Sequence, residues 1–204
     1  MIKKDTALLV FTKTPIEGQV KTRLISNWGS EGALLLYKDL VKKTLETVRS
    51  TDIEDIYLFC TPDIKDPFIK LCSVHFKATL KLQSGGNLGE KMSNAFLKML
   101  KIYKHVLIIG CDCPGITTKD INLAVSKLAE GLDVVLGPSK DGGYYLIGMS
   151  QSKDKLFEKI KWGESSVLSD TRRAISSLQL KSYELPERHD IDTPEDFYGY
   201  FNEI

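Results

Sequence analysis

The chain has 204 residues, of which 28 are Lys or Arg and 27 are Asp or Glu, so its formal net charge is +1. This balance argues against a broadly basic nucleic-acid-binding protein and against a polyacidic tail protein. A hydrophobic fraction of 42% with 27% charged residues is typical of a soluble globular protein. The length predicts one domain over residues 1–204.

The N-terminal region and the cysteines indicate the compartment. The continuous apolar run at residues 7–11 is too short for a signal peptide or a membrane span, so we expect a cytoplasmic protein. The cysteines form no CxxC pair and have no spacing to histidine that suits zinc. We interpret them as reduced thiols in or beside strands: Cys60, Cys72, Cys111 and Cys113.

Short apolar runs of strand length recur along the chain, at residues 7–11, 56–60, 106–110 and 133–136. Because they are apolar throughout, they predict strands that are buried on both faces. Two later stretches, residues 144–149 and 180–185, follow a turn and predict further strands, so the second half should mix strand directions.

Segments with helical period lie between these strands. One predicted face comprises Ala33, Tyr37, Leu40, Val41, Thr44, Leu45 and Val48, and another comprises Met92, Ala95, Phe96, Met99, Leu100 and Tyr103. Residues 87–90, 117–120 and 193–196 have the spacing of helix N-caps with an acidic partner. The alternation predicts an α/β protein, a three-layer α/β/α fold with a mainly parallel mixed sheet.

A basic loop, residues 12–24, follows the first predicted strand. In an open α/β sheet, ligands bind outside the carboxyl ends of the strands. Lys13, Lys21 and Arg23 supply the cationic donors that a polyphosphate needs. Neither the dinucleotide fingerprint nor the P-loop is present. The alternative is a solvated basic loop.

Two further segments that could reach the same edge of the predicted sheet carry acidic residues. Asp112 directly follows a predicted strand, and an extended chain would place Asp190 and Asp192 on one face. Mg²⁺ uses one or two carboxylates together with phosphate oxygens, so all three aspartates are candidate metal ligands. Alternatively, Asp112 turns the chain before Pro114, and Asp192 lies near the positive end of the last helix.

The segment at residues 137–145 contains Asp141 and a glycine pair. A glycine pair allows a close approach of backbone to a ligand, or it only makes a turn. Asp141 is accordingly a candidate acceptor-binding group or base, and a hairpin turn is the alternative.

Six motifs occur in order along essentially the whole chain. They are residues 21–24, Gln83 with residues 87–90, residues 110–114, residues 137–138 with 141–148, residues 162–163, and residues 190–196. Together they resemble the GT-A-type, glycosyltransferase-like members of the nucleotide-diphospho-sugar transferase superfamily. Residues 21–24 are also similar to the corresponding stretch of phospholactate guanylyltransferases.

The resemblance implies a GT-A fold with the nucleotide against the loop after the first strand, the base near Gln83 and Gly89, and Mg²⁺ or Mn²⁺ as cofactor. On this basis the expected nucleotide-binding residues are Thr12, Lys13, Lys21, Arg23, Gln83, Gly89 and Asp112. The expected acceptor-binding residues are Asp141, Gly142, Gly143 and Trp162, and the expected metal ligands are Asp112 with Asp192 or Asp190.

Two departures from the superfamily bear on the reaction. Residues 14–19 replace the glycine-rich loop of sugar-nucleotide pyrophosphorylases, so side-chain cations must carry more of the phosphate contact. Asp112 stands alone, since residues 110 and 111 are Gly and Cys, whereas many GT-A glycosyltransferases have an Asp-x-Asp pair.

Three hypotheses remain, all with a small-molecule ligand and none with a nucleic acid. The first is a nucleotidyltransferase that releases pyrophosphate, in which Asp112 and Asp192 anchor the metal, Lys21 and Arg23 stabilise the leaving group, and Asp141 orients the acceptor. The second is a glycosyltransferase with a nucleotide-sugar donor. The third is a non-catalytic nucleotide-binding module. The sequence leaves the base, the acceptor and the oligomeric state open.

Overall fold

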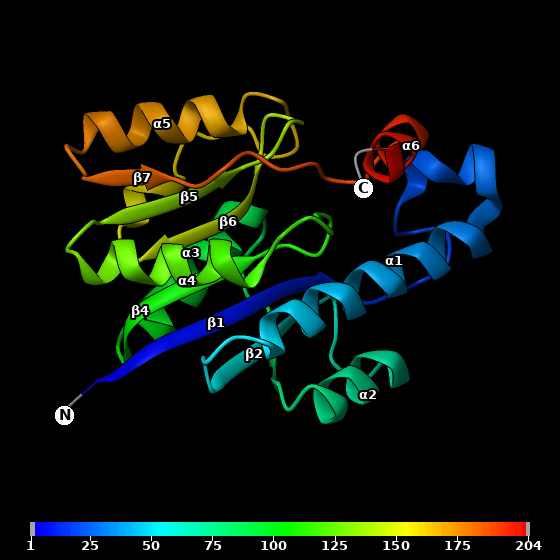
Figure 1. Cartoon of the computed structure of the whole chain (residues 1–204), viewed down its shortest axis with the longest axis horizontal. Coiled ribbons are helices and arrows are strands. Elements are labelled where there is room, and N and C mark those ends of the chain that lie inside the picture. Colours follow the sequence, from blue (N-terminus) through cyan, green and yellow to red (C-terminus); the bar gives the residue numbers. More distant parts are fainter. Residues whose placement is uncertain (1–2, 203–204) are drawn as a thin grey trace.

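The computed structural model describes residues 3–202 of the chain, with side chains to residue 199, as a seven-stranded sheet with helices on both faces (Figure 1). The strand order is β3-β2-β1-β4-β6-β5-β7. Strand β6 runs antiparallel to both of its neighbours, and the other neighbouring pairs are parallel. The strands are β1 (Lys4–Lys13), β2 (Asp55–Thr61), β3 (Thr79–Leu82), β4 (Tyr103–Ile109), β5 (Val134–Pro138), β6 (Tyr144–Met149) and β7 (Ser182–Glu184).

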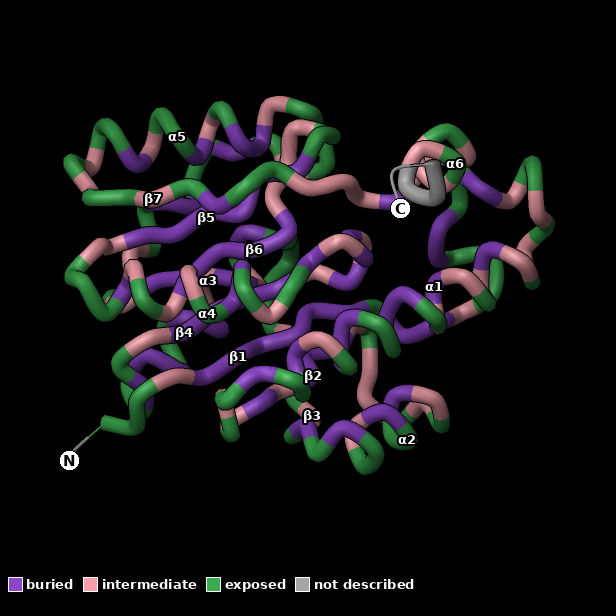
Figure 2. Tube along the Cα trace, viewed as in Figure 1, coloured by how far each residue is buried: buried purple, intermediate pink, exposed green. Residues whose placement is uncertain are grey.

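The central strands are buried on both faces, as Figure 2 shows for β1, β4, β5 and β6. In β1, Leu8 and Val10 belong to one core, and Ala7 and Leu9 belong to the other. Helices α1 (Ile25–Arg49), α2 (Pro67–His75) and α4 (Thr118–Ala129) pack on the first core. Helices α3 (Leu88–Met99) and α5 (Val167–Ser177) pack on the second. The three-layer α/β/α architecture predicted from the sequence is therefore confirmed.

The predicted strands all form, but one strand and one helix boundary differ from expectation. Strand β3 was not predicted, because it lies at the sheet edge and three of its four residues are exposed. The second helical face was extended too far: α3 ends at Met99, and Tyr103 begins β4. Tyr103 is buried there, and its hydroxyl shares a 2.8 Å hydrogen bond with that of Tyr57.

The three predicted helix starts are present. Asn87 caps α3 by accepting from the Glu90 amide at 2.9 Å, although the Glu90 carboxylate accepts from the Gly86 amide instead of closing a full capping box. Thr117 and Asp120 form the complete box at α4. At the last helix, α6 (Pro194–Asn202), Thr193 and Asp196 exchange the same pair of bonds.

The topology brings distant segments to one edge of the sheet. Strands β1, β2 and β4 are parallel and end there, and β6 begins there because it is antiparallel. The chain after β7 returns along this edge, since the Arg188 amide donates to Pro138 O at 3.0 Å and the Ile191 amide donates to Asp112 O at 2.8 Å. Helix α6 then lies beside the start of α1, where the rings of Trp28 and Phe197 are 4.5 Å apart (Figure 1).

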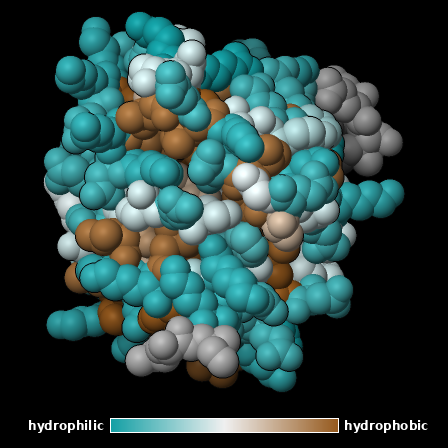
Figure 3. All heavy atoms as spheres, turned by 90° about the vertical axis from the view of Figure 1, so that its left-hand side faces the viewer, coloured by the Kyte–Doolittle hydropathy of each residue, from teal (hydrophilic) through white to brown (hydrophobic). Residues whose placement is uncertain are grey.

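The opposite end of the molecule, which contains the amino ends of these parallel strands, is covered mostly by hydrophilic side chains with apolar patches between them (Figure 3). No helix within the described residues combines the length and the apolar character that a membrane crossing requires.

Candidate active site

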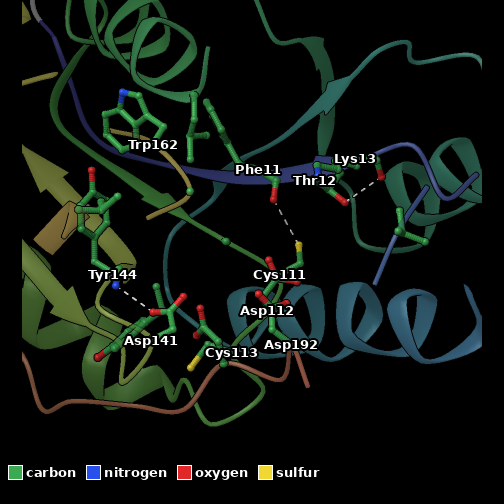
Figure 4. Close-up of a pocket in the computed structure, with 18 of the residues that line it drawn as sticks. Phe11, Thr12, Lys13, Cys111, Asp112, Cys113, Asp141, Tyr144, Trp162 and Asp192 are labelled. Atoms are coloured by element: carbon green, nitrogen blue, oxygen red, sulfur yellow. Dashed lines mark hydrogen bonds between the residues drawn. The ribbon is translucent and has the colours of Figure 1, made fainter. Parts of the chain in front are cut away.

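A cavity of about 710 Å³ opens at the edge where the strands end (Figure 4). All the segments singled out in the sequence contribute to it. Of the predicted site residues, those that line the cavity are Thr12, Lys13, Lys21, Arg23, Gln83, Asp112, Asp141, Gly143, Trp162, Asp190 and Asp192. Gly89 and Gly142 do not line it.

Lys21 is the buried cation at the centre of the site. Its Nζ donates to Ile191 O at 2.6 Å and to Asp192 Oδ1 at 2.7 Å, and it forms an ion pair with Asp112. An ammonium has three protons, so these partners engage all of them. The side chain is only 3% exposed, and the backbone has the left-handed conformation at φ 47°. Lys21 therefore joins the two carboxylates in this structure and has no donor left for a phosphate.

The charge state of Lys21 follows from the same contacts. Burial lowers the pKa of its ammonium, but the nearby carboxylates of Asp112 and Asp192 outweigh this effect and raise the pKa above its ordinary value. Lys21 is thus positively charged at neutral pH. Arg23 contributes more loosely, because its side chain is 67% exposed and its Nη1 lies 3.7 Å from Asp192 Oδ2.

The C-terminal carboxylates alternate as expected for an extended chain. Asp190 and Asp192 line the main cavity, whereas the side chain of Ile191 lines a separate cavity of about 580 Å³ beside Trp28 and Phe197. This alternation depends on the backbone bond from Ile191 to Asp112, which fixes the C-terminal segment against the end of β4.

Asp190 is the least well satisfied group of the site. Its Oδ1 is buried without a hydrogen-bond partner. Burial, reinforced by the charges of Asp112 and Asp141, raises the pKa of this carboxyl to about 8. Two carboxylates, those of Asp112 and Asp192, thus contact the buried ammonium of Lys21, and Asp190 lies near them. An oxygen-rich donor set with an unpaired buried oxygen fits a hard divalent cation such as Mg²⁺ or Mn²⁺.

The described residues do not form a complete metal-binding site in this structure. No three His, Cys, Asp or Glu side chains among residues 3–199 are grouped closely enough to hold a metal ion. The ammonium of Lys21 lies between Asp112 and Asp192, so the two carboxylates could share a metal only after that ammonium moves.

Asp141 supports the turn between β5 and β6. Its Oδ1 accepts the Gly143 amide at 2.8 Å and the Ser139 hydroxyl. The plainer alternative considered for this residue, a hairpin turn, is thus present, and the carboxylate lines the cavity at the same time.

Gln83 and Thr12 have structural partners at the ends of the strands. The Gln83 side-chain amide donates to Phe59 O at 2.8 Å and to Thr12 O at 3.1 Å, which ties β1 to β2. This leaves the Gln83 carbonyl oxygen as its side-chain group for a ligand. The Thr12 hydroxyl shares a 2.8 Å hydrogen bond with that of Tyr37. Sequence reasoning assigned Tyr37 only to the core, because it lies on the apolar face of α1.

Two glycines allow close packing around the cavity. A Cβ at Gly89 would lie 2.5 Å from the Trp162 indole, so glycine lets the start of α3 pack against this ring. A Cβ at Gly142 would lie 2.1 Å from Ser165 O. The turn around Gly142 and the start of α5 are also joined by a 2.8 Å hydrogen bond, which the Leu168 amide donates to Gly142 O. The cavity residues that sequence reasoning missed include Lys91, Glu164 and Ser165, whose polar surroundings gave no distinctive motif.

The cysteines beside Asp112 are buried thiols. Cys111 Sγ donates to Phe11 O at 3.5 Å, and burial together with Asp112 raises its pKa well above the ordinary value. Burial, with the charge of Asp190, likewise raises the pKa of Cys113. A thiol that resists deprotonation is a poor nucleophile, so these residues pack the strand end.

A family model matches residues 44–164, which is more than half of the chain. Its description is "Uncharacterized protein conserved in bacteria (DUF2064)". The chain belongs to the DUF2064 family. The part of this DUF2064 chain that the model matches includes Gln83, Asp112, Asp141 and Trp162. A search of curated proteins gives no significant match.

Solved structures share the fold of this DUF2064 protein. A protein provisionally assigned as a nucleotide-diphospho-sugar transferase, from Desulfovibrio desulfuricans G20, is 29% identical with a TM-score of 0.88, over 98% of this chain and 87% of that one. The 4-diphosphocytidyl-2C-methyl-D-erythritol synthase of Anaerococcus prevotii is 13% identical with a TM-score of 0.62, over 98% and 97% of the two chains.

A third structure is glucosyl-3-phosphoglycerate synthase of Mycobacterium tuberculosis, 11% identical with a TM-score of 0.56, over 98% of this chain and 76% of that one. At these lower identities the likeness concerns the fold alone. The expected membership of the nucleotide-diphospho-sugar transferase superfamily is confirmed.

Proposed function

We propose that this protein is a divalent-metal-dependent nucleotidyltransferase, which transfers the nucleotide of a nucleoside triphosphate to a small acceptor and releases pyrophosphate. The observation that carries the proposal is the convergence of Asp112 and Asp192 on Lys21 at the rim of the cavity. Positioning and charge neutralisation dominate phosphoryl and nucleotidyl transfer, and this arrangement provides groups for both.

In the proposed reaction an acceptor oxygen attacks the α-phosphorus. A new P–O bond forms there as the bond from the α-phosphorus to the bridging oxygen of the leaving pyrophosphate breaks. When the acceptor is a hydroxyl, its proton must pass to a base, and Asp141 is the candidate. Arg23 and Lys13 are exposed residues of the basic loop that line the cavity, which supports a role in pairing with the phosphates.

The proposed metal ligands are Asp112 and Asp192, with Asp190 beside them. A bound Mg²⁺ or Mn²⁺ would neutralise phosphate charge and polarise the reacting phosphoryl group. The unpartnered Oδ1 of Asp190 supports a cation here. The Mycobacterium tuberculosis synthase of the same fold was solved with Mn²⁺ and uridine diphosphate, which supports divalent-metal use by this fold.

Glycosyl transfer from a nucleotide-sugar is the second candidate. It is favoured by the 29% identical structure, which is assigned to the nucleotide-diphospho-sugar transferases. In that reaction the bond between the sugar and the diphosphate breaks, and a nucleoside diphosphate leaves. The absence of an Asp-x-Asp pair around Asp112 favours nucleotidyl transfer.

The two candidates are separated by ligand stabilisation and by products. The protein is incubated with Mg²⁺ or Mn²⁺ and a panel of nucleoside triphosphates and nucleotide-sugars, and its thermal midpoint is recorded. We expect a triphosphate to stabilise the protein most, because a ligand that binds only the folded state raises its stability. Pyrophosphate formation with acceptor mixtures supports nucleotidyl transfer, a nucleoside diphosphate supports glycosyl transfer, and binding without either product indicates a nucleotide-binding module.

The matched variant is Asp112→Asn. We expect it to lower metal-dependent nucleotide affinity by about tenfold or more, which is ~1.4 kcal/mol, while the circular dichroism spectrum stays that of the parent. Asp52→Asn is the control, because Asp52 is exposed and lies outside the cavity. Parental affinity in Asp112→Asn would contradict the metal role.

A further inference from the structure

The charged side chains that line the cavity form two groups, and in the first group the cations Lys21 and Arg23 are paired with the carboxylates of Asp112 and Asp192. The basic loop and α3 contribute the cationic side chains Lys13, Lys21, Arg23 and Lys91. Figure 4 shows Asp141, Tyr144 and Trp162 on the other side of the cavity from Thr12 and Lys13. We define this second side as the acceptor wall, with the lining residues Asp141, Gly143, Tyr144, Trp162, Glu164 and Ser165. Its charged members, Asp141 and Glu164, are both acids.

The acceptor wall is built before any ligand arrives. The amide of Gly143 fixes the Asp141 carboxylate at 2.8 Å. The Leu168 amide, bound to Gly142 O at 2.8 Å, joins this turn to the segment that carries Trp162 and Glu164. The indole of Trp162 packs so closely on Gly89 that a Cβ there would be 2.5 Å from it. A ligand therefore meets a preformed arrangement of Asp141 and Trp162, beside the exposed side chain of Glu164.

The chemistry of this wall selects against anions. Carboxylates only accept hydrogen bonds when they are ionised, so they pair with hydroxyl or ammonium donors. A phosphate would bring negative oxygens next to Asp141 and Glu164 with no cation of the acceptor wall to offset them. The Tyr144 hydroxyl is buried, so this residue offers ring surface and not a donor. Together with the Trp162 ring it gives an aromatic surface for the apolar face of a ring.

From the charge of the acceptor wall we infer that the acceptor is a hydroxyl-bearing ring compound that is uncharged or carries an amine, and that has no phosphate or carboxylate. The inference rests on the proposed function for the assignment of the first group to the nucleotide. It narrows the acceptor class, because the nucleophile is then a hydroxyl oxygen. Such a nucleophile must lose its proton on attack, and the carboxylates of the wall are the groups positioned to accept it.

The charge of the wall is measured first, without any ligand. The chain has two tryptophans, so Trp28→Phe leaves Trp162 as the single indole fluorophore. We expect caesium ions to quench Trp162 several-fold more efficiently than iodide, relative to neutral acrylamide. Glu164→Lys should reduce or reverse this ratio, and Glu158→Lys, an exposed position outside the cavity, should not.

The second arm compares matched ligands on the protein saturated with Mg²⁺ and the best nucleotide. The pairs are glucose with glucose 6-phosphate, glucosamine with glucosamine 6-phosphate, and myo-inositol with its monophosphate, followed by Trp162 fluorescence. We expect each parent compound to bind about tenfold more tightly than its phosphate ester. In Glu164→Lys the preference should shift toward the esters.

Each outcome decides the inference. A phosphate ester that binds as tightly as its parent, or iodide quenching as efficient as caesium quenching, overturns it. If no pair binds, the inference is overturned, because the surface then does not accept compounds of this class. If no nucleotide stabilises the protein in the presence of metal, the proposed function fails, whereas the quenching ratio still tests the wall.

Discussion

Lys21 neutralises Asp112 and Asp192, and a metal ion would compete with its ammonium for the same oxygens. The two carboxylates are 47% and 37% exposed, whereas the Lys21 side chain is 3% exposed. Free metal must therefore displace a buried cation whose three protons are all engaged. A metal that arrives with a nucleotide instead brings phosphate oxygens as new partners for that ammonium.

Replacing Lys21 should separate its effect on the binding of free metal from its effect on the binding of the metal–nucleotide complex. We expect Lys21→Met to raise the affinity for free Mn²⁺ by about tenfold, ~1.4 kcal/mol, because the carboxylates lose their resident cation. The same variant should bind the metal–nucleotide complex more weakly. Mn²⁺ titration followed by electron paramagnetic resonance measures the first effect, and Lys13→Met, at an exposed cation of the same loop, is the control. Unchanged Mn²⁺ affinity in Lys21→Met would show that the ammonium does not block the metal position.

Asp190 makes the stability of the metal-free protein depend on pH. The pKa of its carboxyl is raised from 3.8 to about 8 in the folded state, so between these values the folded protein holds a proton that the unfolded chain has lost. The stability associated with this proton is complete below pH ~4 and is lost as the pH rises through 8.

The variant Asp190→Asn stays neutral and should escape this loss. Between pH 4 and pH 8.5 we expect the free energy of unfolding of Asp190→Asn, taken relative to the parent, to rise by roughly 1–3 kcal/mol. One pKa unit corresponds to ~1.4 kcal/mol, and local rearrangement around the charged carboxylate in the parent offsets part of the total. Urea unfolding of both proteins in a chelating buffer across this range measures it. Asp52→Asn should show no such trend, and parallel stability curves for Asp190→Asn and the parent would contradict the assignment.

At the scale of elements, the turn between β5 and β6 and the segment before α5 are held together by a glycine. A side chain at Gly142 would meet Ser165 O at 2.1 Å, and φ is +88°. Two costs therefore combine at this position, a backbone conformation that favours glycine and a clash with backbone.

We expect Gly142→Ala to lower the free energy of unfolding by roughly 2–4 kcal/mol and to weaken acceptor binding, because the acceptor wall must shift. Gly131→Ala isolates the conformational cost, since Gly131 has φ +93° and open space around its Cβ position. It should lose only about 1 kcal/mol. Denaturant unfolding of the two variants measures the difference, and equal losses would mean that the contact with Ser165 carries no strain.

The elements that sequence patterns predicted best are those that are buried on both faces. The run at residues 7–11 lies within β1, where Ala7, Leu8, Leu9 and Val10 have no exposed surface. Strand β3 was missed because its exposed residues at the sheet edge give no continuous apolar run. The boundary of α3 was misplaced because Tyr103 continues the apolar sequence although the chain has already turned at Ile102, whose amide bonds to Met99 O.

The candidate site likewise has features that could be predicted from the sequence and features that could not. Parallel strands place their ends at one edge, so the meeting of the basic loop with Asp112 and the C-terminal aspartates followed from topology. The hydrogen-bond partners of the individual site residues could not be predicted from the topology. The engagement of Lys21 depends on its left-handed backbone and on the carbonyl of Ile191, and the amide of Gln83 is taken up by two strand carbonyls. Such contacts depend on geometry between segments that no local pattern encodes.

At the scale of the whole molecule, positive and negative side chains are nearly equal in number. A net charge of +1 exerts little long-range attraction, so the proposed recognition of a polyphosphate would depend on groups within a few ångströms of it. Both groups of charged side chains lie at the edge where β1, β2 and β4 end.

The bond from Lys21 to Ile191 spans 170 residues of sequence. Contacts between such distant residues form late, because most of the chain must be ordered before the two ends meet. A polypeptide still emerging from the ribosome can thus assemble β1 to β4 before the bond between Lys21 and Ile191 exists. Under the proposed function, the groups that bind the metal and the nucleotide would come together only once Asp192 has been synthesised and its segment has folded back.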